Sequence, residues 1–578
     1  MTRLSLSRLF FFLLFPAFLL SSPSAQLSAP IPVVRRVADR VIRGGVGPVS
    51  FRRVPAASQS PAWDPATGGS FYSLATAAVP GAGKGGLLLF RAGLRCPKDI
   101  RARFLRDPRN PALRLFVEGR LVLGGPPGKT GEIRLAGGDV HPLLLAVHLP
   151  PGRTPPVRFR IFEKGRESRS CRIVEPGGSS GGPGGPWACL GPLPAPEGAE
   201  KALEGARAAA EEGKAPWKAL PPLEVPVVGR PFTGWIYPEG VLLYALAQLA
   251  KETGDRKYED YLASWWGTAR RLYPDSLFLA RNAPWIRGPY WVRFKRRALD
   301  DTGAMGVAAA EAFFLLGDPF CRETALDMAR YAHTEQTRLP GGTFDRVDGA
   351  GRITLWVDDL YMGCPVMVRR WRITGEADYL DDAARQILGM ARRLQRPDGL
   401  FMHGMRLTEK KKVPWTWGRG NGWAMTAETE VLGALGGGHP LREKVLQVYR
   451  RHAGGILPLQ SKGGMWRQVL DLPRSWEETS STAMFVLSLA RGVRRGWLEG
   501  PMAARAARAA EAGWKGLAAR VSRKGSVQGI CVGTNLGHSL EDYLERPERV
   551  DDLHGLGPVI LAGVEVRRMR ASPGGKRR

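Results

Sequence analysis

The sequence predicts an all-α (α/α)6 toroid, a ring of six helix hairpins, preceded by a small β-rich domain of the sandwich type. Helical patterns dominate from about residue 197 onward. Within them, a glycine and aromatic phrase returns at intervals of about 60 residues, which two helices and their connections fill. Short apolar runs alternate with turns over residues 70–176, as β-strands do. An open helical solenoid is the alternative for the helical part.

Residues 1–28 have the composition of a secretory signal peptide. Arg3 and Arg8 precede a short apolar run, and small residues follow it. No later segment offers about 18 uninterrupted apolar residues, the length that a membrane span needs. We therefore expect a protein that is secreted or lies in the lumen of the secretory pathway, without stable membrane insertion after cleavage. An uncleaved anchor is the alternative.

The remaining boundaries follow from changes in composition. Residues 29–69 lack a clear period and are expected to be an irregular lead-in, and residues 177–196 form a Gly, Ser and Pro linker. Between them we expect the β-rich accessory domain, over 70–176. The helical domain is then expected over 197–567, and a disordered basic tail over 568–578.

The repeat is clearest in four phrases that each follow a helical pattern. A hairpin that cannot bury its apolar face alone stacks on the next hairpin, and six of them close into a ring. Loops at one end of such a ring surround a central cavity, where functional residues gather. The phrases are Gly341-Gly342-Thr343-Phe344, Asp398-Gly399-Leu400-Phe401, Gly463-Gly464-Met465-Trp466 and Lys524-Gly525-Ser526-Val527.

The formal charge of +30 fits an anionic partner such as nucleic acid, a membrane surface or an acidic polysaccharide. Secretion disfavours nucleic acid, which leaves an anionic membrane surface and an acidic polysaccharide as alternatives, and compositional drift as a further explanation of part of the charge. The six cysteines are far apart and form no C-x-x-C pair, and no H-E-x-x-H motif occurs. We therefore expect no metal. Nothing in the sequence indicates the oligomeric state.

The segment Trp415 to Trp423 is typical of a sugar site. Its nine residues hold three indoles, one guanidinium and three glycines, a mixture that a protein core rarely needs. Sugars bind to flat apolar faces beside planar donors, and Arg419 could hold a carboxylate with both terminal nitrogens. A helix-packing loop with an incidental arginine is the alternative.

Two acidic pairs lie about one repeat apart, each at the start of an apolar helical segment. They are Asp300-Asp301 and Asp358-Asp359, and Trp356 precedes the second pair. Either pair could serve only as a helix cap. Two carboxylates at one cavity mouth are, however, the usual equipment for acid and base catalysis at a glycosidic centre. His403 is a ligand contact or a satisfied, half-buried histidine.

In chain order, seven phrases resemble the unsaturated rhamnogalacturonyl hydrolases of glycoside hydrolase family 105, which are related to the unsaturated glucuronyl hydrolases. The resemblance covers about residues 235–564, and the phrases are specific only as a set. They are Trp235–Gly240, Leu299–Gly303, Trp356–Met362, Gly399–Gly404, Trp417–Trp423, Glu478–Met484 and Asp551–Pro558. The sequence departs from the family pattern at Gly418, where the family usually has alanine, and in its N-terminal β-rich region.

The resemblance implies an (α/α)6 barrel that removes a terminal 4,5-unsaturated uronate from acidic oligosaccharides left by polysaccharide lyases. Pectin or rhamnogalacturonan would supply the substrate. In the family an Asp protonates the double bond and activates water, and the resulting hemiketal opens. This chemistry needs only a proton and water, so the resemblance implies no cofactor. Motif correspondence implies Asp359 in this role and Asp301 as the second essential carboxylate. The expected substrate-binding residues are His403, Trp417, Arg419, Asn421, Trp423, Trp356, Asp358, Asp300 and Trp235. A glucuronyl hydrolase and a non-catalytic sugar-binding toroid are the alternatives.

Overall fold

A computed structural model describes most of the helical part of the chain and a set of strands before it. The described residues are 29–43, 45–46, 234–282, 290–294, 296, 299–348 and 350–572, together with the strands that lie between 49 and 228. The signal peptide expected over 1–28 lies outside the described residues. None of the helices in the described ranges combines the length and apolar character that a membrane crossing requires.

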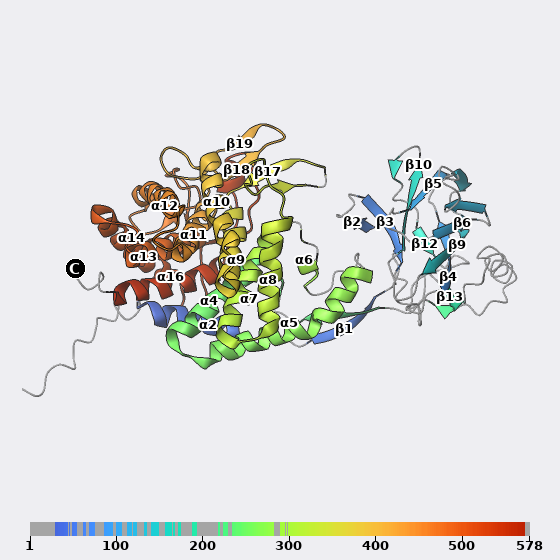
Figure 1. The fold of residues 1–578 in the computed structure, drawn as a ribbon, viewed down its shortest axis with the longest axis horizontal. Helices are drawn as coiled ribbons and strands as arrows, with labels where there is room; N and C mark the ends of the chain where they lie inside the picture. The colour runs from blue at the N-terminus through green and yellow to red at the C-terminus, as the bar shows by residue number, and fades with distance from the viewer. Residues whose placement is uncertain are drawn as a thin grey trace, which may run out of the picture.

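Within the described ranges, six inner helices form a closed ring, which confirms the predicted toroid. Each packs on the next, and the last packs on the first (Figure 1). Their C-caps at Gly254, Gly317 and Gly375 have left-handed backbone, which ends the helix at a tight turn. The inner helices are α4 (Tyr237–Thr253), α7 (Asp300–Leu316), α9 (Asp359–Thr374), α11 (Gly418–Ala434), α13 (Thr479–Arg494) and α16 (Leu553–Ala571).

Outer helices pack on the inner ring, one against each inner helix. Five of them follow their inner partner along the chain. These are α5 (Arg256–Asn282), α8 (Pro319–Arg330), α10 (Ala377–Leu394), α12 (Arg442–Ile456) and α14 (Gly500–Ala519). Short helical segments join some of them, namely α6 (Trp291–Phe294), a π-helical turn over Tyr331–Glu335, a 3-10 turn over Leu457–Leu459 and α15 (Glu541–Leu544).

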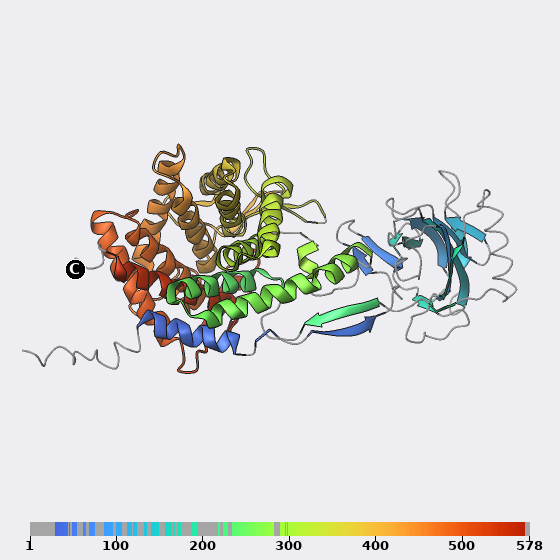
Figure 2. The ribbon, with the colours of Figure 1, turned by 60° about the horizontal axis from the view of Figure 1, so that its bottom comes forward.

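The outer partner of α16 is α2 (Pro30–Ile42), from the opposite end of the chain (Figure 2). The side chains of Val33, Val34 and Val37 are fully buried. On its polar face, Arg40 pairs with Asp551 at 2.8 Å. The expectation of an irregular lead-in over 29–69 was therefore wrong, because these valines recur at helical spacing and find their partner only in the last inner helix.

Strands fill the chain between α2 and α4, and all of their described pairings are antiparallel. One sheet has the order β2-β3-β10-β5-β8, a second has the order β14-β13-β4-β9-β6-β7, and β1 pairs with β15. The strands are β1 (Val49–Val54), β2 (Ala62–Asp64), β3 (Gly69–Leu74), β4 (Gly86–Arg95), β5 (Ile100–Arg106), β6 (Leu113–Val117), β7 (Arg120–Leu123), β8 (Glu132–Leu135), β9 (Val140–Leu149), β10 (Val157–Glu163), β11 (Arg166–Glu167), β12 (Arg172–Val174), β13 (Ala188–Leu193), β14 (Lys218–Ala219) and β15 (Leu223–Val228).

These strands correct two expected boundaries. Strand β13 lies inside the segment 177–196 that was expected to be a linker, where Gly and Pro masked a short apolar run. Strands β14 and β15 lie beyond residue 197, so the inner ring begins only at Tyr237. The β-strands therefore interrupt the helical domain, since α2 precedes them and α4 follows them.

A small sheet covers one end of the ring. Its order is β16-β17-β18-β19, and β17 pairs with both β16 and β18. Its strands are β16 (Arg346–Val347), β17 (Ile353–Trp356), β18 (Gly404–Arg406) and β19 (Lys411–Val413). Four short strands lie in other loops and form two pairs, β20 (Trp466–Arg467) with β21 (Glu477–Glu478) and β22 (Ile530–Cys531) with β23 (Glu548–Arg549).

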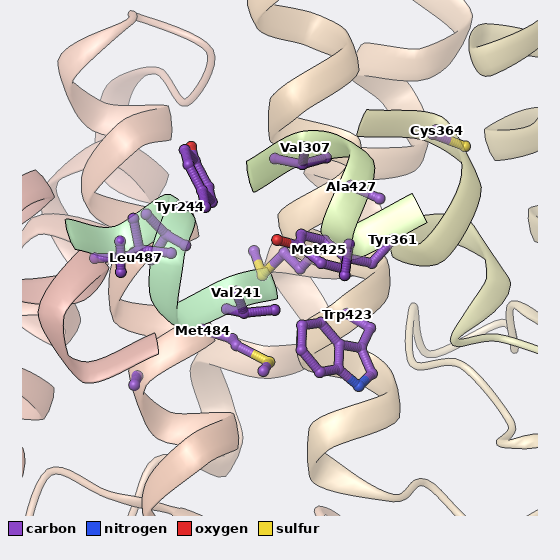
Figure 3. Packing of buried hydrophobic residues seen from close by; sticks show 14 of the residues in the cluster. Val241, Tyr244, Val307, Tyr361, Cys364, Trp423, Met425, Ala427, Met484 and Leu487 are labelled. Carbon is purple, nitrogen blue, oxygen red and sulfur yellow. The ribbon is translucent and has the colours of Figure 1, made fainter. Parts of the chain in front are cut away.

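The core lies between and inside the inner helices, where side chains such as Tyr361, Trp423 and Met425 are buried together (Figure 3). These helices are apolar on most sides because they are packed on most sides. Small residues permit the close approach of neighbouring helices. A Cβ atom on Gly303 of α7 would lie 1.4 Å from the carbonyl oxygen of Met362 on α9.

The basic tail expected from residue 568 does not begin there, because α16 continues to Ala571. Arg568 pairs with Glu252 at 2.8 Å, and Arg570 pairs with Glu511 at 2.6 Å. These ion pairs with the ring keep the start of the expected tail helical.

Candidate active site

The amino ends of the inner helices meet at one end of the ring. The backbone N–H of Tyr237, at the start of α4, donates to Asp301 on α7 at 2.7 Å. Its hydroxyl lies 2.5 Å from His554 Nε2, at the start of α16. Helix amino ends carry partial positive charge, so this mouth favours acidic side chains and anionic ligands.

Both predicted acidic pairs lie at this mouth, and Arg346 of β16 links them. Its guanidinium makes three contacts of 2.6–3.1 Å with the two carboxylate oxygens of Asp359 and lies 2.9 Å from Asp300. The same guanidinium lies 4.4 Å from the ring centre of Trp356. The prediction that the two pairs meet at one site is therefore consistent with the geometry, and an arginine holds them together.

Burial changes the acidity of two of these carboxyl groups. It raises the pKa of Asp359 to about 6, although the charge of Arg346 acts in the opposite direction. It also raises the pKa of Asp301 to about 6, against the lowering effect of the hydrogen bond from Tyr237 N–H. Groups with pKa values near neutrality can hold a proton or release it at physiological pH.

The side chains of Asp358 and His403 face each other in direct contact. Oδ2 of Asp358 lies 3.3 Å from Nε2 of His403, and neither atom has a hydrogen-bond partner. The other ring nitrogen of His403 lies 2.6 Å from the Tyr543 hydroxyl, which itself accepts a bond from Gly537 N–H. The tyrosine therefore donates to His403 Nδ1, which leaves Nε2 as the N–H that points at Asp358.

A second histidine completes a chain of short contacts. His554 Nδ1 lies 2.5 Å from Asp552, and its Nε2 contacts the Tyr237 hydroxyl. Burial and the charge of Arg419 lower the pKa of His554. Burial opposes ionisation of Asp552, but the hydrogen bonds and charge of His554 together with the charge of Arg419 outweigh it and lower the pKa of Asp552. This chain fixes the orientation of the Tyr237 ring at the mouth.

Three of the predicted tryptophans surround the acidic groups. Trp356 is half-buried, and its ring centre lies 5.5 Å from that of His403. Trp417 lies 4.6 Å from His403 on another side and is almost fully buried. Trp423 packs against Tyr361 at 4.6 Å and against Tyr237 at 6.3 Å. Trp356 is thus the most accessible of the three.

Arg419 and Asn421 are committed to the fold. The terminal nitrogens of Arg419 donate to the carbonyl oxygens of Cys531 and Val532 at 2.7 and 2.6 Å, and only its Nε lacks a partner. The Asn421 amide bonds to the backbone of Phe401 in both directions. Arg419 therefore has no free terminal nitrogens with which to bind a carboxylate in the expected two-point manner. Asn421 positions a loop instead of facing a ligand.

Trp235 lies apart from the other predicted site residues. Its ring packs against Trp265, Trp266 and Tyr290, between 5.4 and 6.3 Å from their centres, and Arg293 lies over it at 4.9 Å. This cluster anchors the start of α4 to α5. The geometry therefore does not favour the expected sugar contact of Trp235.

Sequence reasoning missed five residues at the mouth. Tyr237, Asp552 and His554 lie within phrases that carry the family resemblance, so a signal was present. Arg346 follows the glycine and aromatic phrase by two residues, in a position that topology brings to the cavity. Tyr543 lies in α15, where no motif marks it.

Comparisons with known proteins identify the family and the fold of the helical part. The family model described as Glycosyl Hydrolase Family 88 matches residues 225–570. An unsaturated 3S-rhamnoglycuronyl hydrolase of Alteromonas sp. (strain LOR) is 29% identical over 217 residues, which are 36% of this chain and 50% of that protein. The chain thus spans about half the length of that relative. The unsaturated rhamnogalacturonyl hydrolase YesR of Bacillus subtilis (strain 168) is 26% identical over 259 residues, which are 43% of this chain and 68% of that protein.

Two solved structures share the fold. A possible GH105 member from Salmonella enterica superposes with a TM-score of 0.51 at 22% identity, and it covers 58% of this chain and 84% of that one. A family 105 glycoside hydrolase from C. acetobutylicum superposes with a TM-score of 0.50, also at 22% identity, and it covers 58% and 95%. The family model spans more than half of the chain, including the whole inner ring. The chain therefore belongs to glycosyl hydrolase family 88.

Proposed function

We propose that this protein removes a terminal 4,5-unsaturated uronate from acidic oligosaccharides that polysaccharide lyases generate, of the pectin or rhamnogalacturonan type. The observation that carries the proposal is the mouth itself, where five carboxylates, two histidines and three tryptophans lie together and where Asp358 Oδ2 and His403 Nε2 lack partners. Unpaired polar atoms in a buried position are rare and typical of ligand sites. The names of the Alteromonas and Bacillus relatives support the substrate class.

The chemistry needs a proton and a water molecule. An enol ether takes its proton on C4, because the positive charge that forms on C5 is stabilised by the ring oxygen. Water then adds to C5 and returns a proton to the carboxylate, so the acid is regenerated. The hemiketal opens, and the bond to the next sugar breaks. One carboxyl group acts first as an acid and then as a base.

The geometry favours Asp358 as this group, in place of the expected Asp359. Asp359 is fully buried, and both of its oxygens bind Arg346. Asp358 has an oxygen without a partner, and that oxygen faces His403. We therefore assign proton transfer to Asp358 and the positioning of Arg346 to Asp359. Asp301 remains the second carboxylate, and Trp356 is the wall most open to a sugar ring.

Arg346 is the cation best placed for the uronate carboxylate. Its side chain is 16% exposed, whereas Arg419 is fully buried and has both terminal nitrogens occupied. A bound carboxylate would compete with Asp300 and Asp359 for the guanidinium. The predicted role of Arg419 thus narrows to supplying positive charge and holding the 531–532 backbone.

An unsaturated glucuronyl hydrolase acting on other uronate polymers is the second candidate, which the charge of +30 favours. We also propose that the protein is secreted through the segment 1–28 and that the region with strands β2–β13 is a sandwich-like carbohydrate-binding accessory. A non-catalytic toroid is the opposing interpretation. The retention of both acidic pairs at one mouth argues against it.

One experiment separates these functions. The protein is mixed with unsaturated disaccharides from rhamnogalacturonan, from pectin and from a sulfated glycosaminoglycan, and the loss of ultraviolet absorbance of the conjugated double bond is followed. We expect the fastest loss with the pectic substrates. Fastest loss with the glycosaminoglycan substrate selects the glucuronyl version, and no loss with any of the three contradicts a catalytic function on this bond.

A further inference from the structure

The carboxyl ends of the six inner helices surround a second cavity, of about 720 Å³, at the end of the ring opposite the candidate active site. Lys251 of α4 contacts Glu311 of α7 there, and Arg494 of α13 contacts Glu565 of α16. Inner helices of about 16 residues place the two ends about 24 Å apart. The cavity is therefore separate from the acidic mouth, and its volume is within the range of small-molecule sites.

The floor of this cavity is a buried network of arginines and glutamates. Glu430 is held between Arg369 and Arg491, with Arg491 at 2.6 Å, and it accepts a bond from the Tyr244 hydroxyl at 2.9 Å. Glu311 lies 3.0 Å from Arg369. These arginine charges lower the pKa of Glu430, although burial acts against them. The floor carboxylates are thus ionised and fully paired.

The rim has more positive charge than the floor can neutralise. Seven basic and three acidic side chains line the cavity, an excess of four positive charges. The negative ends of the helix dipoles offset part of this excess. Arg495 forms no ion pair with any described residue, and Arg372 reaches only Glu311, at 3.7 Å. Burial and the charges of the neighbouring Arg494 and Arg491 lower the pKa of Arg495.

Aromatic side chains accompany these cations. Trp371 and Trp497 both line the cavity, and Arg372 lies 4.5 Å from the ring centre of Phe314. Arginines beside flat apolar faces bind oxyanions on planar or cyclic scaffolds, because the guanidinium fork and the ring act together. A single small anion would use only part of the volume.

We propose that this cavity is a second, non-catalytic site for a multiply charged oxyanion, in which Arg372 and Arg495 hold the ligand at the rim. The ligand chemistry is a set of carboxylate, sulfate or phosphate oxygens. It has two sources, a charged oligosaccharide or a free inorganic anion. The site is independent of the reaction proposed above, because no group of the acidic mouth lines it.

The test is calorimetric titration of the full-length protein at low ionic strength with two probes, sodium phosphate and saturated trigalacturonate. Trigalacturonate has no double bond, so the proposed reaction cannot consume it. The binding variant is Arg372→Gln with Arg495→Gln. The matched control is Arg505→Gln with Arg508→Gln, which removes the same charge from the exposed face of α14. Thermal unfolding checks that each variant is folded.

We expect the wild type to bind at least one probe. The Arg372→Gln, Arg495→Gln variant should bind that probe about tenfold more weakly, and the control variant should change the affinity by less than about twofold. Tighter binding of trigalacturonate identifies a charged saccharide, and binding of phosphate alone identifies a free anion. The proposal is overturned if neither probe binds, or if the control pair weakens binding as much. Hydrolysis of an unsaturated disaccharide by the wild type, followed in parallel, tests only the proposed function.

Discussion

Replacing each member of the Asp358-Asp359 pair by Asn separates catalysis from positioning. Asn keeps the volume of Asp and removes the charge. In Asp359→Asn, Arg346 keeps only Asp300 as a carboxylate partner, because its three short contacts with Asp359 lose their charge. The raised pKa of Asp359 shows that burial already disfavours its charge, so we expect the loss of this pair to cost about 1–2 kcal/mol of unfolding free energy, less than the loss of a fully compensated buried pair. Asp358→Asn keeps an amide oxygen that can face the Nε2–H of His403, so we expect a change below about 0.5 kcal/mol.

The expected effects on the reaction are in the opposite order. Loss of a general acid lowers kcat by about 10²–10⁴, so Asp358→Asn should be nearly inactive and normally stable. The kcat of the folded fraction of Asp359→Asn should fall by less than about tenfold. Both variants are assayed by loss of double-bond absorbance and by urea unfolding. An Asp359→Asn protein of wild-type stability without activity, beside an active Asp358→Asn protein, would refute the assignment.

The other predictions concern stability. The raised pKa of Asp301 means that the folded state holds the proton more tightly than the unfolded chain, so its contribution is lost as pH rises from about 4 through about 6. Asp301→Asn should therefore stabilise the protein by about 1–3 kcal/mol at pH 8 and not at pH 4, in urea unfolding at both values; an equal effect at both contradicts the burial argument. Glu430→Gln leaves two buried arginines short of a charge and should cost about 3–5 kcal/mol, measured in the same way; a neutral effect would mean that the floor network is solvated. Val37→Asp buries an unpaired charge between α2 and α16 and should lower the midpoint of thermal unfolding by several degrees, whereas an unchanged midpoint would show that α2 does not belong to the ring.

The ring could be predicted from the sequence because its repeat has a local physical cause. The glycines of the recurring phrase, Gly342, Gly399, Gly464 and Gly525, all have φ between 84° and 93°. Such a backbone favours glycine, so the turn leaves a signature in the sequence wherever it occurs. The meeting of the two acidic pairs was predictable because each pair lies at the start of an inner helix, and the repeat brings these helix starts to one end of the ring.

The rest depends on partners far away in the chain. The pattern of α2 was readable, but its outer position depends on contact with α16. Whether Asp358 or Asp359 faces the mouth depends on Arg346, which comes from a β-strand, and on His403 from the adjoining loop. The commitment of Arg419 to the carbonyl oxygens of Cys531 and Val532 leaves no pattern in the sequence. Tertiary contacts of this kind select among roles that a motif leaves open.

The position of α2 has a consequence for the order in which the molecule forms. Ribosomes synthesise α2 before every other helix of the ring and its partner α16 last, and the Arg40–Asp551 contact joins residues 511 positions apart. The entropy of closing so long a loop grows only slowly with length, whereas the time needed to find the contact grows strongly. Until α16 has been synthesised, the valine face of α2 lacks its main partner and is exposed to aggregation. The Tyr237–His554 contact crosses the seam between α4 and α16, so the acidic mouth is completed only at that final closure.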